Sequence, residues 1–429
     1  MKRRLFLLLL AACLGLSACQ AQNLPGREDA SQPAQTDPAG HTPDGVGSAD
    51  TPAPTEPDPV LPVIPPEESM GFTELDSQLI AYLRENGLAD QNFTVSPLSC
   101  KAALALAAMG AEGETLDQLL AALGFSDLDA LAEWYATVLV GVADFDGRIF
   151  GKDKEDYAYR VVNAIFHNAA CDGEFREAYK ALVAHKLAAE AGSYDADKIT
   201  AAINAWVNDQ TQGMIPSIVE DASDAAAVLV NALYLKTKWP EAFHASDLTD
   251  FTTVHGETVQ KEYITRTEKY RYYSDDAGQM VVIPLQGGVS IALILGDAGD
   301  LSVKLEQAQT RKVCVTMPKF EVETSLDKKE LVKFLKSVGC SRMFVDGTAQ
   351  FDPMFTEGVY VDDIIHKAKV KVDENGLEAA AATAIVMMRN TALPNPEEPV
   401  EFTADRPFRF VIFREDGAPE LLFWGQIME

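Results

Sequence analysis

The residues of this chain that are best suited to chemistry are spread along it rather than grouped. Its 429 residues contain no GxSxG, HExxH, Walker-type or GxGxxG motif, which are typical of serine hydrolases, zinc peptidases and nucleotide-binding proteins. Residues Asp144 to Gly147 match only the first positions of a calcium loop, so we interpret them as a solvated acidic turn. These patterns predict neither an enzyme nor a metal or organic cofactor. The histidines occur singly, at His41, His167, His185, His244, His255 and His366.

The six cysteines predict no metal site either, because no two of them have CxxC spacing. Cys13 and Cys19 belong to the N-terminal segment. The other four are far apart in the sequence, so an exported protein could pair some of them, and the spacing leaves the pairing open. We interpret these four as buried small apolar side chains. They are Cys100, Cys171, Cys314 and Cys340.

The N-terminus has the pattern of an export signal. Residues 1–18 carry three basic residues directly after Met1 and continue with an apolar run that is short for a membrane span, which needs about 20 residues. The run ends in Leu16-Ser17-Ala18-Cys19, which resembles the bacterial lipobox, in which the signal is removed before a cysteine that then receives lipid. We therefore expect lipidation at Cys19 and a lipid-anchored or secreted protein outside the cell. An ordinary signal peptide cut near Ala18 is the alternative, and it also exports the chain.

Residues 19–68 and the net charge limit the partners of the chain. The segment is rich in Pro, Asp, Thr and Gln and has almost no large apolar residue before Val60, which predicts a disordered tether. The formal net charge of −29 repels nucleic acids, anionic lipids and polyanions such as heparin. We therefore expect no nucleic-acid partner.

The rest of the chain, 69–429, reads as one α+β domain with helices first and strands afterwards. Ser96 and Pro97 begin a helix that continues to Met109, and Thr115 to Gln118 read as a capping box of the next helix, which ends at Gly124. Further helices are predicted over 199–210 and 326–338. Strands are predicted over 227–236 and 367–372, and hairpins over 280–295 and 408–427, the latter with its turn at Asp416-Gly417.

Residues 373–399, DENGLEAAAATAIVMMRNTALPNPEEP, combine conflicting local preferences. The acidic start and the alanines favour a helix, whereas Ile385 to Met388 favour a strand, and the prolines that follow permit no regular structure. Such a segment requires a special explanation in a folded domain.

Motifs from about residue 70 to 429 resemble, in order and spacing, those of serpins, the large inhibitors of serine and cysteine proteases. The resemblance implies helices packed on three β-sheets, with an exposed reactive loop at about residues 374–400. The matching motifs are 92–99 (NFTVSPLS), 211–213 (TQG), 229–234 (LVNALY) with Lys238-Trp239, 317–320 (MPKF), 366–368 (HKA), 374–381 (ENGLEAAA), 404–408 (ADRPF) and 423–425 (FWG).

The resemblance also implies a mechanism and a partner. An extracellular serine protease would attack the loop as bait and form an acyl-enzyme, after which the cut loop would insert into the central sheet as a new strand and trap the protease covalently. We expect a monomer before this reaction. A non-inhibitory serpin that serves as a binding module or plain substrate is the alternative, and a solute-binding lipoprotein is a third interpretation, from outside the family.

An inserting strand needs small or apolar side chains at alternate positions. Counting by twos from Leu377 meets this requirement at every position, and Glu378 falls on the opposite face. Gly376 supplies backbone freedom at the hinge. Leu377 departs from the small or β-branched residues that are usual at that place in the family. The hinge residues that the resemblance implies are Glu374, Gly376, Leu377, Ala379, Ala380, Ala381 and Ala382.

The bait bond has more than one candidate. The usual family count from Gly376 puts the bond between Asn390 and Thr391, and a loop one residue shorter puts it after Arg389. Arg389 suits trypsin-like proteases, whereas Met388 suits chymotrypsin- or elastase-like ones. These alternatives remain open.

The resemblance assigns two further groups of residues. Lys319, Glu374 and Trp239 would form the breach, where the loop first enters the sheet. A hydrogen-bonded shutter would lie beneath the strands that part, formed by Ser96, Ser99, Asn231 and His366. A buried polar cluster of purely structural importance is the alternative interpretation of the shutter.

Overall fold

The computed structural model describes most of the chain from Thr73 onward. The predicted signal (1–18), Cys19 and the tether lie outside the described residues, as do Ala379–Ala382, Arg389–Thr391 and the turn at Asp416-Gly417. Within the described part, no helix combines the length and apolar character that crossing a bilayer requires. The described residues are 73–153, 155–171, 173–297, 299, 301–326, 330–377, 398–415 and 420–429.

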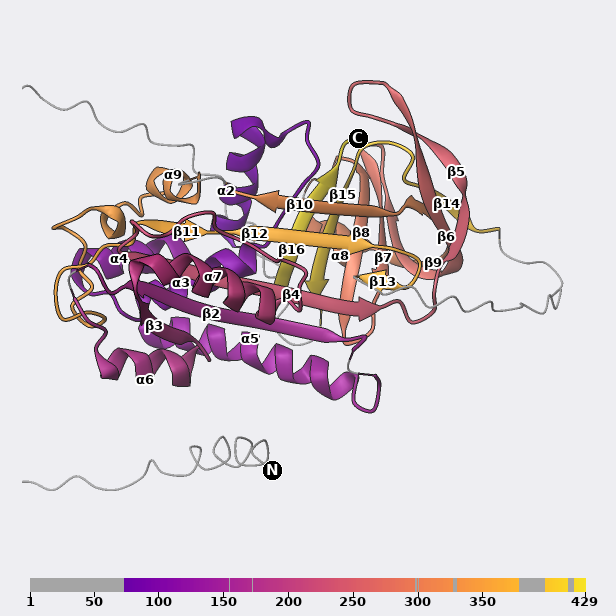
Figure 1. Ribbon diagram of the computed structural model, residues 1–429. Coiled ribbons are helices and arrows are strands. Elements are labelled where there is room, and N and C mark those ends of the chain that lie inside the picture. Colours follow the sequence, from indigo (N-terminus) through magenta and orange to yellow (C-terminus); the bar gives the residue numbers. More distant parts are fainter. Residues whose placement is uncertain are drawn as a thin grey trace, which may run out of the picture. The chain divides into compact units, whose positions relative to one another are not determined.

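The helices begin and end where local chemistry favours it (Figure 1). Ser96 caps α3, because its hydroxyl accepts the Ser99 N–H at 3.2 Å, and Pro97 occupies the first helical position. Gly124 ends α4 with a left-handed backbone, φ 78°. The helices are α2 (Glu74–Leu83), α3 (Pro97–Ala108), α4 (Gly113–Leu123), α5 (Leu128–Arg148), α6 (Glu177–Lys186), α7 (Ala196–Gln210), α8 (Leu301–Gln307) and α9 (Glu330–Ser337), with short turns η1 (Arg84–Leu88) and η2 (Arg342–Phe344).

The larger sheet contains the C-terminal hairpin and the long strand β6. Its strand order is β1-β16-β15-β8-β7-β6-β9-β14, and β5 pairs with β6. Both predicted hairpins are confirmed, as β7–β8 and β15–β16. The strands are β1 (Phe93–Val95), β5 (His244–Thr252), β6 (Thr258–Ser274), β7 (Gly278–Pro284), β8 (Val289–Gly296), β9 (Gln309–Pro318), β14 (Val400–Thr403), β15 (Phe408–Arg414) and β16 (Glu420–Ile427).

The smaller sheet has the order β10-β12-β13-β4-β2-β3, and β11 pairs with β4. The strands predicted over 227–236 and 367–372 are confirmed as β4 and β12. The strands are β2 (Ala158–Asn168), β3 (Glu190–Tyr194), β4 (Ala227–Lys238), β10 (Phe320–Ser325), β11 (Asp363–Ile365), β12 (Lys367–Val372) and β13 (Gly376–Leu377).

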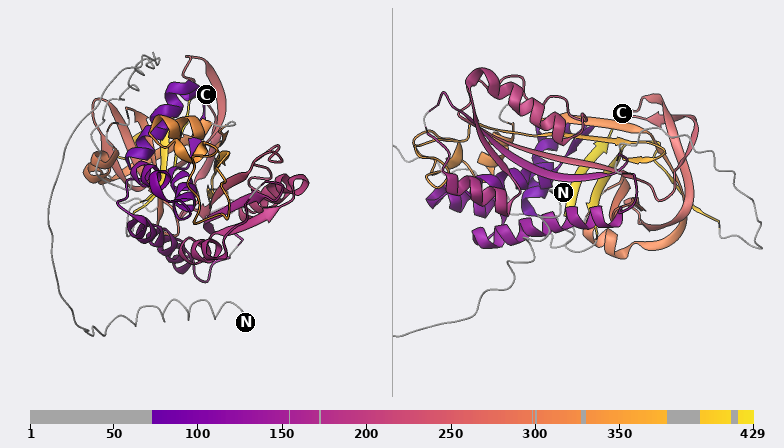
Figure 2. Two further views of the ribbon diagram at one scale, coloured as in Figure 1. Left: turned by 90° about the vertical axis from the view of Figure 1, so that its left-hand side faces the viewer. Right: turned by 60° about the horizontal axis from the view of Figure 1, so that its bottom comes forward.

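The smaller sheet is covered on both faces (Figure 2). Along β4, Leu229 and Leu233 point into the main core, which α3 shares, whereas Val228 and Val230 point into a second apolar cluster beneath α7. This alternation is the period-two geometry of a strand. Because both faces are buried, the strand is nearly continuously apolar, with Asn231 as a buried polar exception.

The three expected sheets are hydrogen-bonded as two among the described residues. Strand β6 pairs with β5 through its first half and with β7 through its last residues, and β9 lies along most of its other edge. The 17-residue strand β6 therefore joins β5, β9 and β14 to the strands of the C-terminal hairpin and of β7–β8. Together they form a single nine-stranded sheet.

Two local predictions were wrong. The capping box at Thr115 does not form: α4 begins at Gly113, and the Thr115 hydroxyl accepts the N–H of Gln350 instead. Residues 144–147 lie in the last turns of α5 rather than in a turn, because Phe145 is buried in the core and holds this part of the chain helical. The helix predicted over 326–338 is confirmed as α9, which is described from Glu330 to Ser337.

An ion pair between α2 and α3 is buried in the core. Lys101 Nζ lies 2.9 Å from the Asp76 carboxylate, and the two side chains are 3% and 1% exposed. The same carboxylate accepts the Thr73 N–H at 2.8 Å, which caps α2. Removal of one partner therefore leaves a charge in the core without compensation.

We expect Lys101→Met to lower the free energy of unfolding by about 3–5 kcal/mol, because the buried Asp76 side chain then loses its ion-pair partner. The measurement is the urea midpoint by circular dichroism. Lys180→Met is the matched control: its partner Glu177 is exposed, so its midpoint should match the wild type. Equal midpoints for the two variants would mean that the native state does not depend on the pairing of Asp76 with Lys101.

Candidate functional site

The two-residue strand β13 lies between two strands that are otherwise separate. Leu377 pairs with Val372 of β12 on one side and with Thr237 of β4 on the other, antiparallel to both. Leu377 is buried, as the predicted alternation requires. The chain that follows β12 therefore turns back and begins a strand between its neighbours.

Beyond β13, six residues of β4 have no neighbouring strand on one edge among the described residues. Residues 231–236 pair with β2 on one side, but the described residues provide no strand on the other. The gap ends at β11, whose Asp363, Ile364 and Ile365 pair in parallel with Val228, Leu229 and Val230. We call this gap between β4 and β12 the seam. It is closed by β13 at its head and by β11 at its foot.

Gly376 allows the backbone to enter the head of the seam. Its φ is 153°, and a Cβ at this position would lie 2.2 Å from the Thr237 carbonyl oxygen and 2.6 Å from Lys238 Cα. Neither backbone atom can move aside, so a side chain here is excluded on grounds of space as well as conformation.

The turn before β13 is held by three consecutive carbonyl groups. The Trp239 indole N–H donates to the Asp373 carbonyl at 3.0 Å, and the Trp239 backbone N–H donates to Asn375 at 2.9 Å. The Phe243 N–H donates to Glu374 at 2.8 Å. Trp239 is buried against the Phe243 ring, so the aromatic pair fixes the direction in which the chain leaves the turn. Burial raises the pKa of the Asp373 carboxyl, although it accepts two backbone N–H groups of the turn.

The structure brings the predicted breach residues together. Lys319 Nζ lies 3.3 Å from Glu374 and also forms an ion pair with Glu262. The hydrogen bond to Glu262 and then that to Glu374 raise the pKa of Lys319. Because these side chains are partly exposed, the pairs contribute at most about 1 kcal/mol, and Trp239 contributes more to the site through burial.

His366 lies where the chain passes from β11 to β12, beside the N-terminus of α3. Its Nε2 accepts the Ser96 N–H at 3.3 Å, and its Nδ1 lies 3.6 Å from Cys100 Sγ. Burial lowers the pKa of His366 to about 4, so the imidazole is neutral at pH 7. Because Nε2 is an acceptor, the proton resides on Nδ1 and points to the sulfur.

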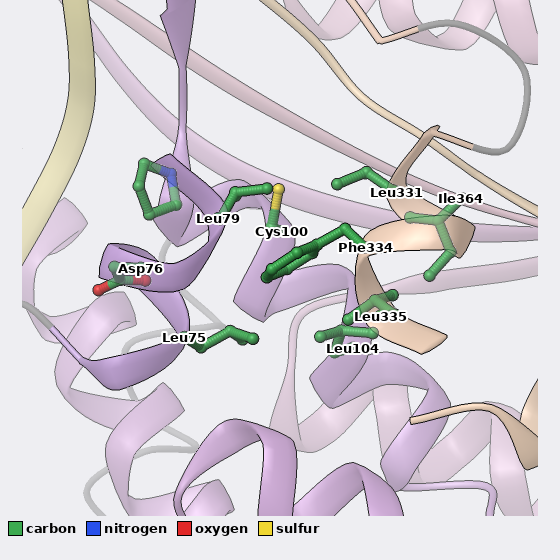
Figure 3. A pocket seen from close by; sticks show the side chains of 10 residues that line it. Leu75, Asp76, Leu79, Cys100, Leu104, Leu331, Phe334, Leu335 and Ile364 are labelled. Carbon is green, nitrogen blue, oxygen red and sulfur yellow. The ribbon is translucent and has the colours of Figure 1, made fainter. Parts of the chain in front are cut away.

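Cys100 also borders a small apolar cavity between α2, α3, α9 and β11 (Figure 3). The cavity measures about 10 Å³, and its lining has no exposed polar surface, so it is expected to stay dry. Ile364 of β11 reaches it from the foot of the seam. Release of β11 from β4 would therefore also disturb the packing of Ile364.

The predicted shutter divides into two groups. Ser96, Ser99 and His366 lie together, whereas the Asn231 side-chain amide donates to the Val162 carbonyl and to Asn163, the latter at 2.6 Å. Asn163 in turn donates to the Tyr135 hydroxyl of α5 at 2.5 Å. Asn231 Oδ1 is buried and accepts no hydrogen bond from the described residues.

Sequence reasoning missed Cys100, Asn163 and Tyr135 as members of these groups. Cys100 follows the cap of α3 by four residues, so its position on the helix side facing His366 could have been noticed. No comparable signal existed for Asn163 and Tyr135, because β2 and α5 were not predicted. All four cysteines after Cys19 are free: Cys100 and Cys340 are buried as expected, whereas Cys171 and Cys314 are partly exposed.

A ladder of charges joins β12 to β10 on one face of the sheet. Lys367 lies 2.7 Å from Glu323, and Lys369 lies 2.8 Å from Glu321 and 3.2 Å from Glu323. Six consecutive residue pairs add backbone hydrogen bonds. Strands β10 and β12 are therefore joined much more firmly to each other than β12 is to β4.

We expect acid to destabilise the native state through His366. The unfolded imidazole binds a proton near pH 6.5 and the native one near pH 4, so the unfolded state binds more protons in between. Stability is thus fully present above pH 6.5 and is lost as pH falls toward 4, where His366⁺ would direct a second donor at the Ser96 N–H. The measurement is the fall in Tm between pH 7 and pH 4.5, which should be smaller in His366→Gln than in the wild type.

His185 is exposed, so His185→Gln is the control and should lose as much Tm as the wild type. An identical fall in Tm for the wild type and both variants would refute the role of His366.

We expect Gly376→Ala to expel β13 from the seam, because its Cβ would overlap the Thr237 carbonyl. Hydrogen–deuterium exchange of the peptide 372–378 should then be at least about tenfold faster, the effect of 1.4 kcal/mol. Gly358→Ala is the control, because nothing lies within 4 Å of its added Cβ. Unchanged exchange in Gly376→Ala would mean that β13 tolerates the side chain.

Comparison with known proteins agrees with this architecture. The family model described as "Serpin (serine protease inhibitor)" matches residues 73–429. An uncharacterised serpin-like protein of Thermococcus kodakarensis is 32% identical over 79% of this chain and 81% of its own length. Serpin-ZXA of Oryza sativa is 32% identical over 80% and 91%. The leukocyte elastase inhibitor of Xenopus laevis is 27% identical over 83% and 98%.

Solved structures share the fold. The insect Serpin48 of Tenebrio molitor, described as highly specific, superposes with a TM-score of 0.66 at 26% identity, covering 82% of this chain and 96% of its own. The thermophilic serpin Tengpin in its native state gives 0.68 at 24%, covering 81% and 91%. With the family match over 73–429 and this shared α+β fold, the chain belongs to the serpin family, whose members are typically protease inhibitors rather than enzymes.

Proposed function

We propose that this serpin is a single-use inhibitor of extracellular serine proteases, which traps its target by inserting the cut loop into the seam. The observation that carries the proposal is β13: the strand that would insert has already begun, in register, at the head of an unfilled gap.

Continuing the β13 register down the seam aligns each inward residue with a core-facing residue of β4. The pairs Gly376–Lys238 and Leu377–Thr237 extend to Ala379 opposite Leu235 and Ala381 opposite Leu233. Thr383 then lies opposite Asn231, and opposite His366 by the β12 register. Its hydroxyl could donate to Asn231 Oδ1, which has no donor among the described residues.

Insertion becomes favourable only after the loop is cut. Residues 377–389 span about 40 Å as a strand, at about 3.3 Å per residue. The eleven steps from Arg389 to Val400 reach about 36 Å, and Val400 is held in β14 by pairing with β9. To bring Arg389 to the foot of the seam, the intact loop would have to return to Val400 within this reach, so we expect insertion only after the cut or after β14 leaves β9.

The chemical step uses the protease's own machinery. The protease serine oxygen attacks the bait carbonyl carbon, the C–N bond to the next residue breaks, and the new amine leaves with the proton that the serine gave up. The chain upstream remains on the protease as an ester. Insertion that outpaces attack of water on this ester would preserve the covalent complex.

Three candidates for the bait bond follow from the sequence, and two of them suggest different classes of target protease. Arg389 suits a trypsin-like target, Met388 suits an elastase- or chymotrypsin-like one, and the family count favours Asn390–Thr391. A relative bears the name leukocyte elastase inhibitor, which is compatible with the second class. A non-inhibitory serpin remains the alternative function, in which the loop is cut without trapping.

We also propose that the chain is exported and anchored by lipid at Cys19. The support is the signal-like segment 1–18 with its lipobox-like end, followed by the tether to residue 68. Metabolic labelling with a fatty-acid probe, lost in Cys19→Ser, tests this separately from inhibition.

We expect an SDS-resistant band near the summed mass when the protein is mixed with trypsin, elastase or chymotrypsin, and a higher Tm for the cleaved molecule. Ala381→Glu should abolish the band and convert the protein to a substrate, because its carboxylate would be buried against Leu233. Leu393→Glu adds the same charge beyond the bait bond and should keep the band.

The mass of the released C-terminal peptide locates the bond. Cleavage of the wild type with neither band nor gain in Tm would refute the proposal, whereas a gain without a band would indicate the non-inhibitory alternative.

A further inference from the structure

Two arginines meet where η1 lies against the larger sheet. Arg409 belongs to β15 and is paired directly with Gln426 of β16. The Gln426 side chain is fully buried, and its amide donates to the carbonyls of Leu88 and Ala89, at 2.8 and 2.9 Å. Arg84 begins η1, the short turn that ends at Leu88. The register and these hydrogen bonds therefore bring Arg84 and Arg409 together from distant parts of the sequence.

Neither guanidinium has a counter-ion among the described residues. The Arg84 side chain forms no hydrogen bond or ion pair with any residue of the described ranges, and its Nε is buried. Arg409 Nη1 donates to the Gly296 carbonyl at 2.9 Å, whereas its Nε is buried without an acceptor. Burial, and then the charge of Arg84, lower the pKa of Arg409. Because a guanidinium stays charged at neutral pH, two like charges remain close together.

The acidic composition of the chain does not explain this pair. With 65 acidic and 36 basic side chains, an arginine is expected to find a carboxylate. Asp297 is near enough for its charge to act on Arg409, but it forms no ion pair with that side chain and instead accepts the Gly299 N–H at 3.0 Å. Glu85, which follows Arg84, is exposed. The two positive charges therefore lack compensation within the described structure.

The unpaired N–H groups suit an oxyanion. With Nη1 of Arg409 occupied, its Nε and Nη2 present a fork that matches two oxygens of a phosphate or sulfate. Arg84 supplies further donors and the second positive charge, which a doubly charged anion would neutralise. Ordered water could accept the same N–H groups but would leave both charges uncompensated. Because Gln426 already holds the backbone of η1, little of it needs to be ordered on binding.

We propose that Arg84 and Arg409 bind a small dianionic oxyanion, phosphate or sulfate, at the junction of η1 with β15. The inference does not depend on the proposed inhibition, because the site includes neither the loop nor the seam. A bound anion would join the end of α2 to the C-terminal hairpin and remove the repulsion between the two arginines. The net charge of −29 disfavours the headgroups of an anionic bilayer as its source.

The test is a titration of the full chain with sodium phosphate at pH 7, against sodium chloride of equal ionic strength. We expect phosphate, and not chloride, to raise the Tm by about 2 °C or more at saturation and to slow hydrogen–deuterium exchange of the peptide 82–92. Arg84→Gln and Arg409→Gln should each lose both effects. In chloride, Arg84→Gln should be at least as stable as the wild type, because it removes the repulsion. Arg406→Gln is the matched control: Arg406 is exposed and paired with Asp405, so this variant should keep both effects.

Three outcomes would overturn the inference. Equal Tm gains in phosphate and chloride would mean that salt merely screens the two charges. A phosphate gain that both Arg84→Gln and Arg409→Gln keep would mean that the anion binds elsewhere. Sedimentation with phosphatidylglycerol vesicles that is lost in Arg409→Gln, without any response to dissolved phosphate, would assign the two arginines to a lipid headgroup instead of a free anion.

Discussion

The edge of β4 at residues 231–236, beside which the described residues provide no strand, is the constraint on which the rest of this molecule depends. A sheet normally supplies hydrogen bonds along both edges of a buried strand, and an edge that lacks them raises the free energy of the native state. Strand β13 pairs with β4 at one end of this edge. In the proposed function, the segment that follows β13 would extend this pairing along the edge.

The two ends of the seam differ in chemistry. At the head, Trp239 and Phe243 hold the turn through three carbonyl groups, which fixes the direction in which the chain enters β13. At the foot, β11 is held by three residue pairs and by the packing of Ile364. His366 lies between β11 and β12, where a neutral imidazole joins the seam to α3. The charge ladder of β10 and β12 keeps these two strands together, so in the proposed function β12 would part from β4 rather than from β10.

A segment that is exposed in one state and buried in another must satisfy two environments with one set of side chains. Alternation satisfies the core side, because residues 377 to 387 are small or apolar at every second position. The alternate positions of the other parity begin with Glu378, continue with alanines and end with Val386 and Met388. Under the proposed insertion the two conflicting preferences have a use, because the segment must stay outside the sheet before the cut and become a strand after it.

Much of the local structure could be predicted from the sequence by itself. The cap at Ser96, the alternation of 367–372 and the hairpins follow from short-range sterics and hydrogen bonding, and the serpin motifs sufficed to identify the family.

Only the tertiary structure decided which buried polar groups meet. Ser96 and His366 are 270 residues apart, and Asn231 bonds to Asn163 rather than to either of them. The sequence does not predict such pairs. A polar residue in an apolar run indicates that a buried hydrogen-bond partner is needed, but the partner's strand and its register depend on the tertiary structure.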